Sequence, residues 1–138
     1  LYLTNCWEAG MELKLDFCME VRCVQANAKV REDAGKVAFL RGPVCYCMEE
    51  ADNGKNLHLL RIKEKGIKEE VLVEKSDELG HEMCILRVPG LREVPEEIAA
   101  GLYTEYRPPK EEEVTLTLIP YYAWSNRGEG EMSVWIRR

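Results

Sequence analysis

The 138-residue sequence lacks several patterns that would assign a function directly. No run approaches the ~18 consecutive apolar residues of a membrane-spanning helix. Neither of the glycine-rich phosphate-binding motifs, the P-loop and the dinucleotide fingerprint, is present. The formal net charge is −6 and the pI is about 5.1, with no basic stripe along the chain. Phosphate backbones and anionic lipids attract cationic surfaces, so we expect neither nucleic acid nor a membrane as partner.

Histidine is scarce, and cysteine follows no recognisable framework. His58 and His81 are the only histidines, and neither lies in a local catalytic signature. Cys45 and Cys47 share one face of a predicted strand, but a lone C-x-C pair is a weak zinc pattern beside paired C-x-x-C motifs. The six cysteines lack the spacing of a small disulfide-stapled domain. We interpret them as reduced, small apolar side chains, which favours a cytoplasmic protein.

What the sequence does contain is a succession of short strand patterns. Residues 12–23 alternate strictly between apolar and polar side chains, as in a half-buried strand. Further strands are predicted at residues 36–40, 44–48, 57–62, 69–74, 83–91, 114–119 and 132–136. The last two runs are expected to pair across the intervening turn. Residues 94–101 are the one predicted helix. We therefore expect an all-β protein, an antiparallel β-sandwich or jelly-roll with at most one short helix, in a single domain spanning residues 1–138.

Acidic side chains are too numerous to identify a glycosidase acid/base pair by counting. Glu64, Glu69, Glu70 and residues 111–113 lie in charged runs, which are usually solvated faces. Glu49 differs because it directly follows the apolar run at residues 44–48. We interpret Glu49 as a structural carboxylate that satisfies a turn.

An aromatic cluster near the end of the chain is the candidate binding site. The candidate ligand-binding residues are Tyr121, Tyr122, Trp124, Asn126 and Arg127. Aromatic rings beside an amide and a guanidinium are typical of sugar-binding surfaces. Alternatively, the rings belong to the core of a last hairpin, and Arg127 pairs with Glu129 or Glu131 across its turn. In an alternating strand Tyr122 and Trp124 would share one face, with Tyr121 on the other. The sequence alone leaves both interpretations open.

Three blocks, taken in order, resemble a known family. Trp7–Gly10 precedes the alternating strand, the RGPVCYCME block at residues 41–49 leads into Asp52 and Asn53, and IPYYAWSNRG follows at residues 119–128, ahead of MSVW. Together these blocks resemble the C-terminal β-region of glycoside hydrolase family 127, the β-L-arabinofuranosidases, long described only as a domain of unknown function. The resemblance covers nearly the whole chain, and the second and third blocks are its specific part. One departure is Met11, which stands where relatives commonly have the aspartate of W-x-x-G-D.

The resemblance implies that catalysis lies outside this chain. Family members are similar in using a zinc-bound cysteine nucleophile and a glutamate acid/base in a helical (α/α) barrel and its cysteine-rich segment, upstream of the matched region. No catalytic residue and no cofactor is therefore assigned to this chain, and Cys45 and Cys47 are not equated with the family's metal ligands. The chain would be a C-terminal fragment of a larger hydrolase, which agrees with a first stretch, LYLTN, that begins as though inside a strand.

Three functional hypotheses follow. The chain could be a non-catalytic accessory domain that supports the catalytic barrel of the same polypeptide. It could instead be an independent carbohydrate-binding module that uses the closing aromatics. A third hypothesis is a homodimer assembled through an apolar edge strand such as residues 44–48.

Overall fold

The computed structural model describes residues 2–64, 70–78, 80–95 and 102–138, and it consists mainly of strands. The strands are β1 (Val21–Val24), β2 (Lys36–Arg41), β3 (Val44–Glu49), β4 (Leu60–Ile62), β5 (Leu72–Ser76), β6 (Met83–Val94), β7 (Lys110–Pro120), β8 (Met132–Ser133) and β9 (Ile136–Arg137). The helical elements are α1 (Glu50–Asn53) and the 3-10 turns η1 (Arg31–Asp33), η2 (Leu57–Leu59) and η3 (Tyr121–Ala123). Within the described residues, no helix is long and apolar enough to cross a membrane.

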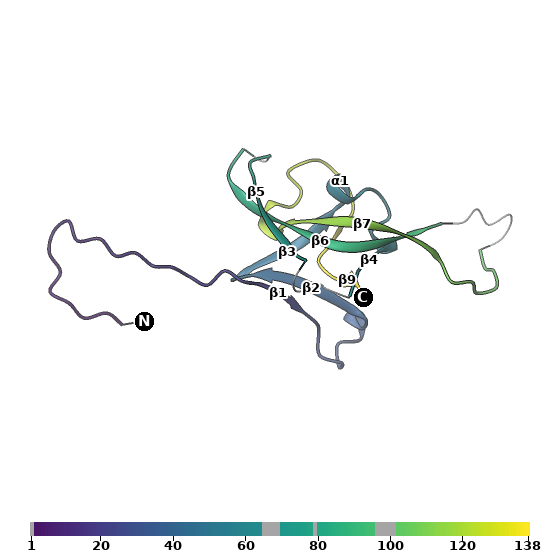
Figure 1. The fold of residues 1–138 in the computed structure, drawn as a ribbon, viewed down its shortest axis with the longest axis horizontal. Helices are drawn as coiled ribbons and strands as arrows, with labels where there is room; N and C mark the ends of the chain where they lie inside the picture. Colours follow the sequence, from purple (N-terminus) through teal and green to yellow (C-terminus); the bar gives the residue numbers. More distant parts are fainter. Residues whose placement is uncertain (1, 65–69, 79, 96–101) are drawn as a thin grey trace.

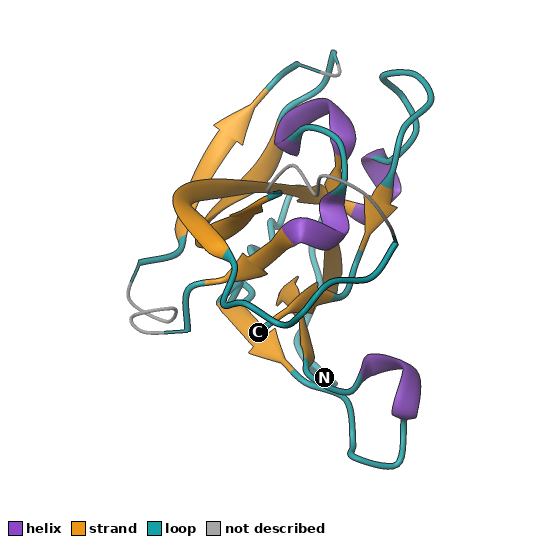
Figure 2. Ribbon diagram, turned by 90° about the vertical axis from the view of Figure 1, so that its right-hand side faces the viewer, coloured by secondary structure: helices purple, strands orange, loops and turns teal. Residues whose placement is uncertain are grey.

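Six of the strands close into a ring. The neighbours run β2–β9–β4–β6–β7–β3, and β3 also pairs with β2, which returns the sheet to its starting strand (Figures 1 and 2). The pairings are antiparallel except for the short parallel contact between β4 and β9. β1, β5 and β8 add to the ring at β2, β6 and β3. The predicted all-β class is confirmed, but the sheet closes into a barrel rather than forming the two layers of a sandwich or jelly-roll.

The core lies inside this ring, and a smaller cluster lies outside it. Buried side chains that alternate along the strands fill the interior, among them Phe39, Tyr46, Leu86, Leu118 and Ile136. The intervening residues point outward, and some of them form a second buried cluster of Cys47, Met83, Ile85, Ile119 and Ala123. Partly buried Met132 and Val134 pack against this second cluster. The segment after β7 therefore covers one outer face of the barrel wall.

The strand predicted at residues 12–23 is present only as β1. β1 pairs with β2 in the register Val21↔Arg41, and β2 then turns at Gly42 (φ +57°) and Pro43 into β3. The backbone N–H of Gly42 donates to the Glu20 carbonyl at 3.3 Å, which is the last contact of this ladder. Residues before Glu20 have no partner in β2, because the chain has turned at Gly42 and Pro43 into β3. The alternating pattern is correct for an extended segment, but no described strand pairs with it beyond β1.

The predicted closing hairpin also differs from the structure. Residues 132–136 divide between β8, which pairs with β3, and β9, which pairs with β2 and β4. Their expected partner, β7, pairs instead with β6 and β3. As a result β3 lies between β2 and β7 and is no edge strand, so it cannot provide the edge expected for a homodimer. The predicted helix at residues 94–101 begins with Val94, which is the last residue of β6; residues 96–101 lie outside the described part of the chain.

Met11 occupies the turn of the first sequence block. Gly10 has φ +89°, a conformation that glycine adopts readily, and the Met11 N–H donates to the Glu8 carbonyl at 3.2 Å. The Met11 sulfur accepts from the Glu8 N–H at 3.2 Å. The thioether of Met11 thus closes this turn together with its own backbone N–H.

Candidate functional site

The aromatic cluster lies on a tight turn rather than a strand. β7 ends at Pro120, and η3 follows, closed by the Trp124 N–H donating to the Tyr121 carbonyl at 3.2 Å. Ala123 in this turn is buried in the outer cluster. The turn therefore attaches to the barrel wall through its smallest side chain, and its rings point elsewhere.

The three rings are exposed. The accessible fractions of Tyr121, Tyr122 and Trp124 are 45%, 63% and 40%. Tyr121 and Trp124 lie beside each other with ring centroids 5.9 Å apart, and Tyr122 lies 6.5 Å from the ring of His81. The interpretation that places these rings in the core is therefore wrong. Together with His81 they form an aromatic surface, defined here as Tyr121, Tyr122, Trp124 and His81.

Arg127 does not present its guanidinium to that surface. Nη1 donates to Asp52 Oδ1 at 2.7 Å, and Nη2 donates to both Asp52 Oδ2 and Glu49 Oε2 at 2.5 Å. Glu78 adds a longer ion pair at 3.6 Å. The hydrogen bonds to Asp52, and then those to Glu49, raise the pKa of Arg127 above its already high ordinary value. Arg127 is thus a permanent structural cation, and its predicted partners, Glu129 and Glu131, were wrong.

Glu49 has the structural role that its position suggested. Its side chain is only 7% exposed, and Oε1 accepts the Ser125 N–H at 2.8 Å while Oε2 pairs with Arg127. Ser125 has φ +66°, so this bond secures a strained residue in the turn. Both carboxylate oxygens of Glu49 are therefore engaged within the fold.

Asn53 extends the same network into β7. Its Nδ2 donates to the carbonyls of Glu49 and Thr117 at 3.0 and 2.8 Å, and its Oδ1 accepts the Thr117 N–H at 2.9 Å. Arg92 donates in turn to the Asn53 carbonyl. The two specific sequence blocks are therefore joined physically, through Asp52 and Asn53 on one side and Arg127 on the other. Sequence reasoning missed these contacts, although charges of opposite sign at the ends of both blocks were a usable signal.

Asn126 contributes to the turn and not to the ring cluster. It is exposed, and its Nδ2 donates to the Ala123 carbonyl at 2.9 Å. Of the five candidate residues, the structure brings Tyr121, Tyr122 and Trp124 together at the surface. It places Asn126 and Arg127 in bonds that stabilise the loop.

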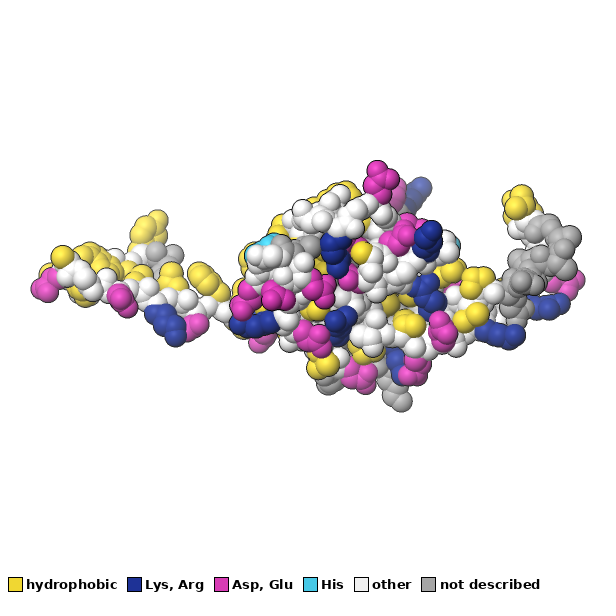
Figure 3. All heavy atoms as spheres, turned by 90° about the horizontal axis from the view of Figure 1, so that it is seen from above, with side chains coloured by type: hydrophobic (Ala, Val, Ile, Leu, Met, Phe, Trp, Pro, Cys, Tyr) yellow, Lys and Arg dark blue, Asp and Glu magenta, His cyan; other side chains and the backbone are white. Residues whose placement is uncertain are grey.

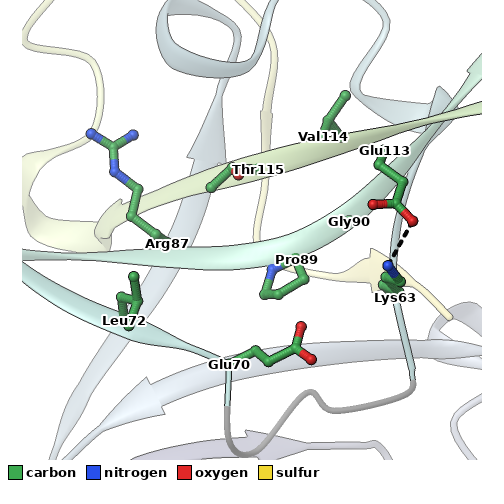
Figure 4. Close-up of a pocket in the computed structure, with 9 residues that line it drawn as sticks. All are labelled: Lys63, Glu70, Leu72, Arg87, Pro89, Gly90, Glu113, Val114 and Thr115. Carbon is green, nitrogen blue, oxygen red and sulfur yellow. Dashed lines mark hydrogen bonds and ion pairs between the residues drawn. The ribbon is translucent and has the colours of Figure 1, made fainter.

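Two hollows near these elements have several of their charged side chains bonded within the fold. One, of about 220 Å³, lies under the closing loop, defined as residues 124–131 between η3 and β8. There the Glu50 carboxylate accepts a hydrogen bond from the Glu131 N–H, and the Glu131 carboxylate accepts one from the Leu57 N–H. The other, of about 290 Å³, lies across β6 and β7 (Figure 4). Its two cations are paired, Lys63 with Glu113 at 2.6 Å and Arg87 with Glu74 at 3.0 Å.

Cys47 of β3 packs as a small apolar side chain in the outer cluster. Cys47 is fully buried, and burial, followed by the nearby Glu49 carboxylate, raises the pKa of its thiol to about 12. No group of three or more potential metal ligands occurs within the described ranges.

Comparison with known proteins adds relatives of greater length. A non-reducing end β-L-arabinofuranosidase of Bifidobacterium longum subsp. longum is 39% identical over 129 residues, which are 93% of this chain and 20% of that protein. The structure resembles a family 127 β-L-arabinofuranosidase from Geobacillus stearothermophilus T6, with a TM-score of 0.77 and 37% identity over 86% of this chain and 18% of that one. A family 127 β-arabinofuranosidase structure gives a TM-score of 0.69 and 35% identity, covering 86% and 17%.

The two solved structures resemble this chain in fold, and the chain spans only about a fifth of the length of these relatives. Residues 21–137 match the sequence profile of the glycoside hydrolase family 127 C-terminal domain. The match covers the whole barrel, from β1 to β9. The chain therefore belongs to glycoside hydrolase family 127, and its residues 21–137 are the C-terminal domain of that family.

Proposed function

We propose that this chain is a non-catalytic accessory domain of a β-L-arabinofuranosidase-like glycoside hydrolase. Its role is to support the catalytic (α/α) barrel, which lies in the preceding part of the same polypeptide. In this proposal the zinc and its cysteine ligands belong to that preceding part, and the domain contributes none of them. A cytoplasmic location remains a prediction from the cysteine content.

The observation that carries the proposal is the use of the motif residues. Glu49 and Asp52 both form ion pairs with Arg127 at the junction of β3, α1 and the closing loop. Asn53 completes the hydrogen bonding of β7. These motif side chains thus stabilise the fold of the chain itself, as expected of a supporting domain.

The test compares the chain with its parent polypeptide. The purified chain is expected to release no detectable chromophore from an aryl β-L-arabinofuranoside, whereas the parent does so. The parent carrying Arg127→Met, which weakens this domain, should lose activity at a lower temperature than the unsubstituted parent. Specific turnover by the chain alone would contradict the proposal.

A second candidate function is carbohydrate binding by the aromatic surface. The exposure of Tyr121, Tyr122 and Trp124 favours it, because flat faces that water can reach are what a sugar ring stacks on. Arg127 does not contribute to this candidate sugar-binding surface, because its hydrogen bonds are directed to Glu49 and Asp52.

Tryptophan fluorescence distinguishes this candidate. L-Arabinose and short arabinose oligosaccharides are titrated into the chain, and a saturable change is expected if the surface binds sugar. Trp124→Ala should abolish the change. Trp7→Ala is the matched control, because Trp7 is also exposed but lies far along the chain, and the response should persist without it. A flat titration would reject sugar binding and leave the accessory role intact.

A further inference from the structure

The N-terminal arm, defined as residues 2–20, extends away from the barrel (Figure 1). Two contacts fix its end: the Glu20 carbonyl accepts the Gly42 N–H, and the Met19 sulfur packs so closely on Gly42 that a Cβ there would overlap it. From Tyr2 to Cys18 every residue is exposed. The arm is therefore anchored at one end and uncovered along the rest of its length.

The exposed side chains of the arm are patterned. Leu13, Leu15 and Phe17 alternate with polar residues, and their accessible fractions are 55%, 53% and 77%. Yellow apolar side chains accordingly line much of the arm in Figure 3. Water opposes such exposure, and a free tail gains nothing from a strict period of two. A strand with one face in a core requires that period.

Among the residues that the structure describes, the barrel offers the arm no partner strand. The arm continues β1, whose partner β2 has already turned at Gly42 and Pro43 into β3. β1 itself pairs with β2 at one end of the strand order. A sheet that accepts residues 11–18 must therefore lie beyond this barrel.

The family comparison indicates which sheet this is. The match to the C-terminal domain begins at residue 21, where the arm ends. The alignment with the Bifidobacterium relative spans 129 residues, more than residues 21–138 contain, so it extends into the arm. Four-fifths of that relative lies outside the aligned part. The arm is thus shared with the longer protein but does not belong to the domain that follows it.

We propose that residues 11–18 form a strand in a β-sheet of the region that precedes this domain in the parent polypeptide. Leu13, Leu15 and Phe17 enter the core of that sheet, and Lys14 and Asp16 face water. The inference rests on the proposed function in one respect, namely that the parent has such a region. The Met19–Gly42 contact then joins two sheets through one continuous chain, which couples the two domains rigidly.

Hydrogen exchange followed by mass spectrometry tests the proposal. In the isolated chain the amides of residues 12–18 should exchange at the rate of an unstructured peptide. In the parent polypeptide their exchange should slow by at least about 100-fold, as for a paired strand. Equally rapid exchange in both proteins would overturn the inference.

A pair of adjacent substitutions tests the orientation of the strand. Leu15→Glu should abolish the protection in the parent, whereas Lys14→Glu, the matched control on the opposite face, should leave it intact. In the isolated chain neither substitution should change the thermal melting curve. Loss of protection with both substitutions, or unfolding of the isolated chain by Leu15→Glu, would contradict the assignment.

Light scattering separates the parent's own sheet from a second copy of this chain. The isolated chain is expected to be a monomer under the conditions of the exchange experiment. A dimer that Leu15→Glu converts to monomer would identify a second copy as the partner and overturn the inference. If the proposed function is wrong, the result is different. The arm is then protected from hydrogen exchange in the parent, but the parent hydrolyses no arabinofuranoside.

Discussion

Arg127 is the side chain through which the closing loop is fixed to the barrel. Its side chain is 18% exposed, and the guanidinium contacts Glu49 at the end of β3 and Asp52 in α1. A buried carboxylate deprived of its partner is costly, because the charge has neither water nor a counter-ion. The three groups therefore act as a unit, and Arg127 is its only cation among the described residues.

Replacing Arg127 by methionine should destabilise the domain by roughly 3 kcal/mol, since the apolar stem is kept and the charge is lost. Urea unfolding followed by circular dichroism measures the change. Lys75→Met is the matched control: Lys75 pairs with Glu82 at 2.9 Å, but both side chains are about 70% exposed, and no measurable change is expected. Equal effects of the two substitutions would show that the Arg127 pairs are as weak as surface ones.

The stability of the fold should decrease at alkaline pH because of the Cys47 thiol. Burial raises the pKa of its thiol from an ordinary value of 9.0 to about 12, so only the unfolded chain ionises readily above pH 9. The stabilisation is complete below pH 9 and is lost as the pH rises towards 12. Between pH 8 and pH 10 the free energy of unfolding should fall by about 1 kcal/mol from this group.

Urea unfolding at the two pH values measures this loss, and Cys47→Ala is the control that should reduce it. Burial also raises the pKa of Tyr46, so part of the alkaline destabilisation should persist in that variant. An identical pH dependence in both proteins would contradict the assignment to Cys47.

At the scale of elements, α1 is important because of one residue. This short helix ends at Asn53, whose side chain makes hydrogen bonds with both the N–H and the carbonyl of Thr117 in β7. The β3–β7 ladder extends only to the pair Met48↔Leu118. Asn53 therefore replaces the backbone partner that β7 lacks at its next residue.

Asn53→Ala should cost about 2 kcal/mol, because it leaves buried backbone groups of Thr117 without partners. Asn126→Ala is the matched control, since Asn126 is exposed and makes a single bond to the Ala123 carbonyl. Chemical denaturation of both variants makes the comparison. A smaller loss for Asn53 than for Asn126 would mean that water replaces the missing partner at Thr117.

Local patterns predicted the elements of the barrel better than their pairing. β2 and β3 around Gly42 and Pro43 follow from two apolar runs separated by a turn signal. The alternation of residues 12–20 predicted a half-buried strand, whereas residues 12–18 are exposed in this structure, because alternation shows that the two faces differ and not what covers them. At Tyr121–Ala123 the sequence suggested a continued strand, whereas the chain turns directly after Pro120, and the rings become exposed.

Closure of the sheet is a property of the whole molecule, and no local sequence pattern predicts it. A sandwich and a barrel use the same alternating strands and differ only in which distant strands meet. Here β9, a two-residue strand, connects the two sides of the ring. It pairs with β2 through Val37↔Ile136 and with β4 through Arg61↔Arg137. A strand so short gives almost no signal in the sequence.

Removing residues 132–138 should therefore prevent folding altogether. The deletion takes away β8 and β9, opens the ring between β2 and β4, and removes Ile136, which is 1% exposed in the core. The expected result is a collapsed chain without a cooperative thermal transition and with narrow amide dispersion in a proton–nitrogen NMR spectrum. Deleting residues 2–8 is the control of equal length, since that part of the arm is exposed throughout, and it should leave dispersion and transition unchanged. Native dispersion after the C-terminal deletion would show that the remaining strands form a stable open sheet, and that ring closure is a consequence of folding rather than a requirement for it.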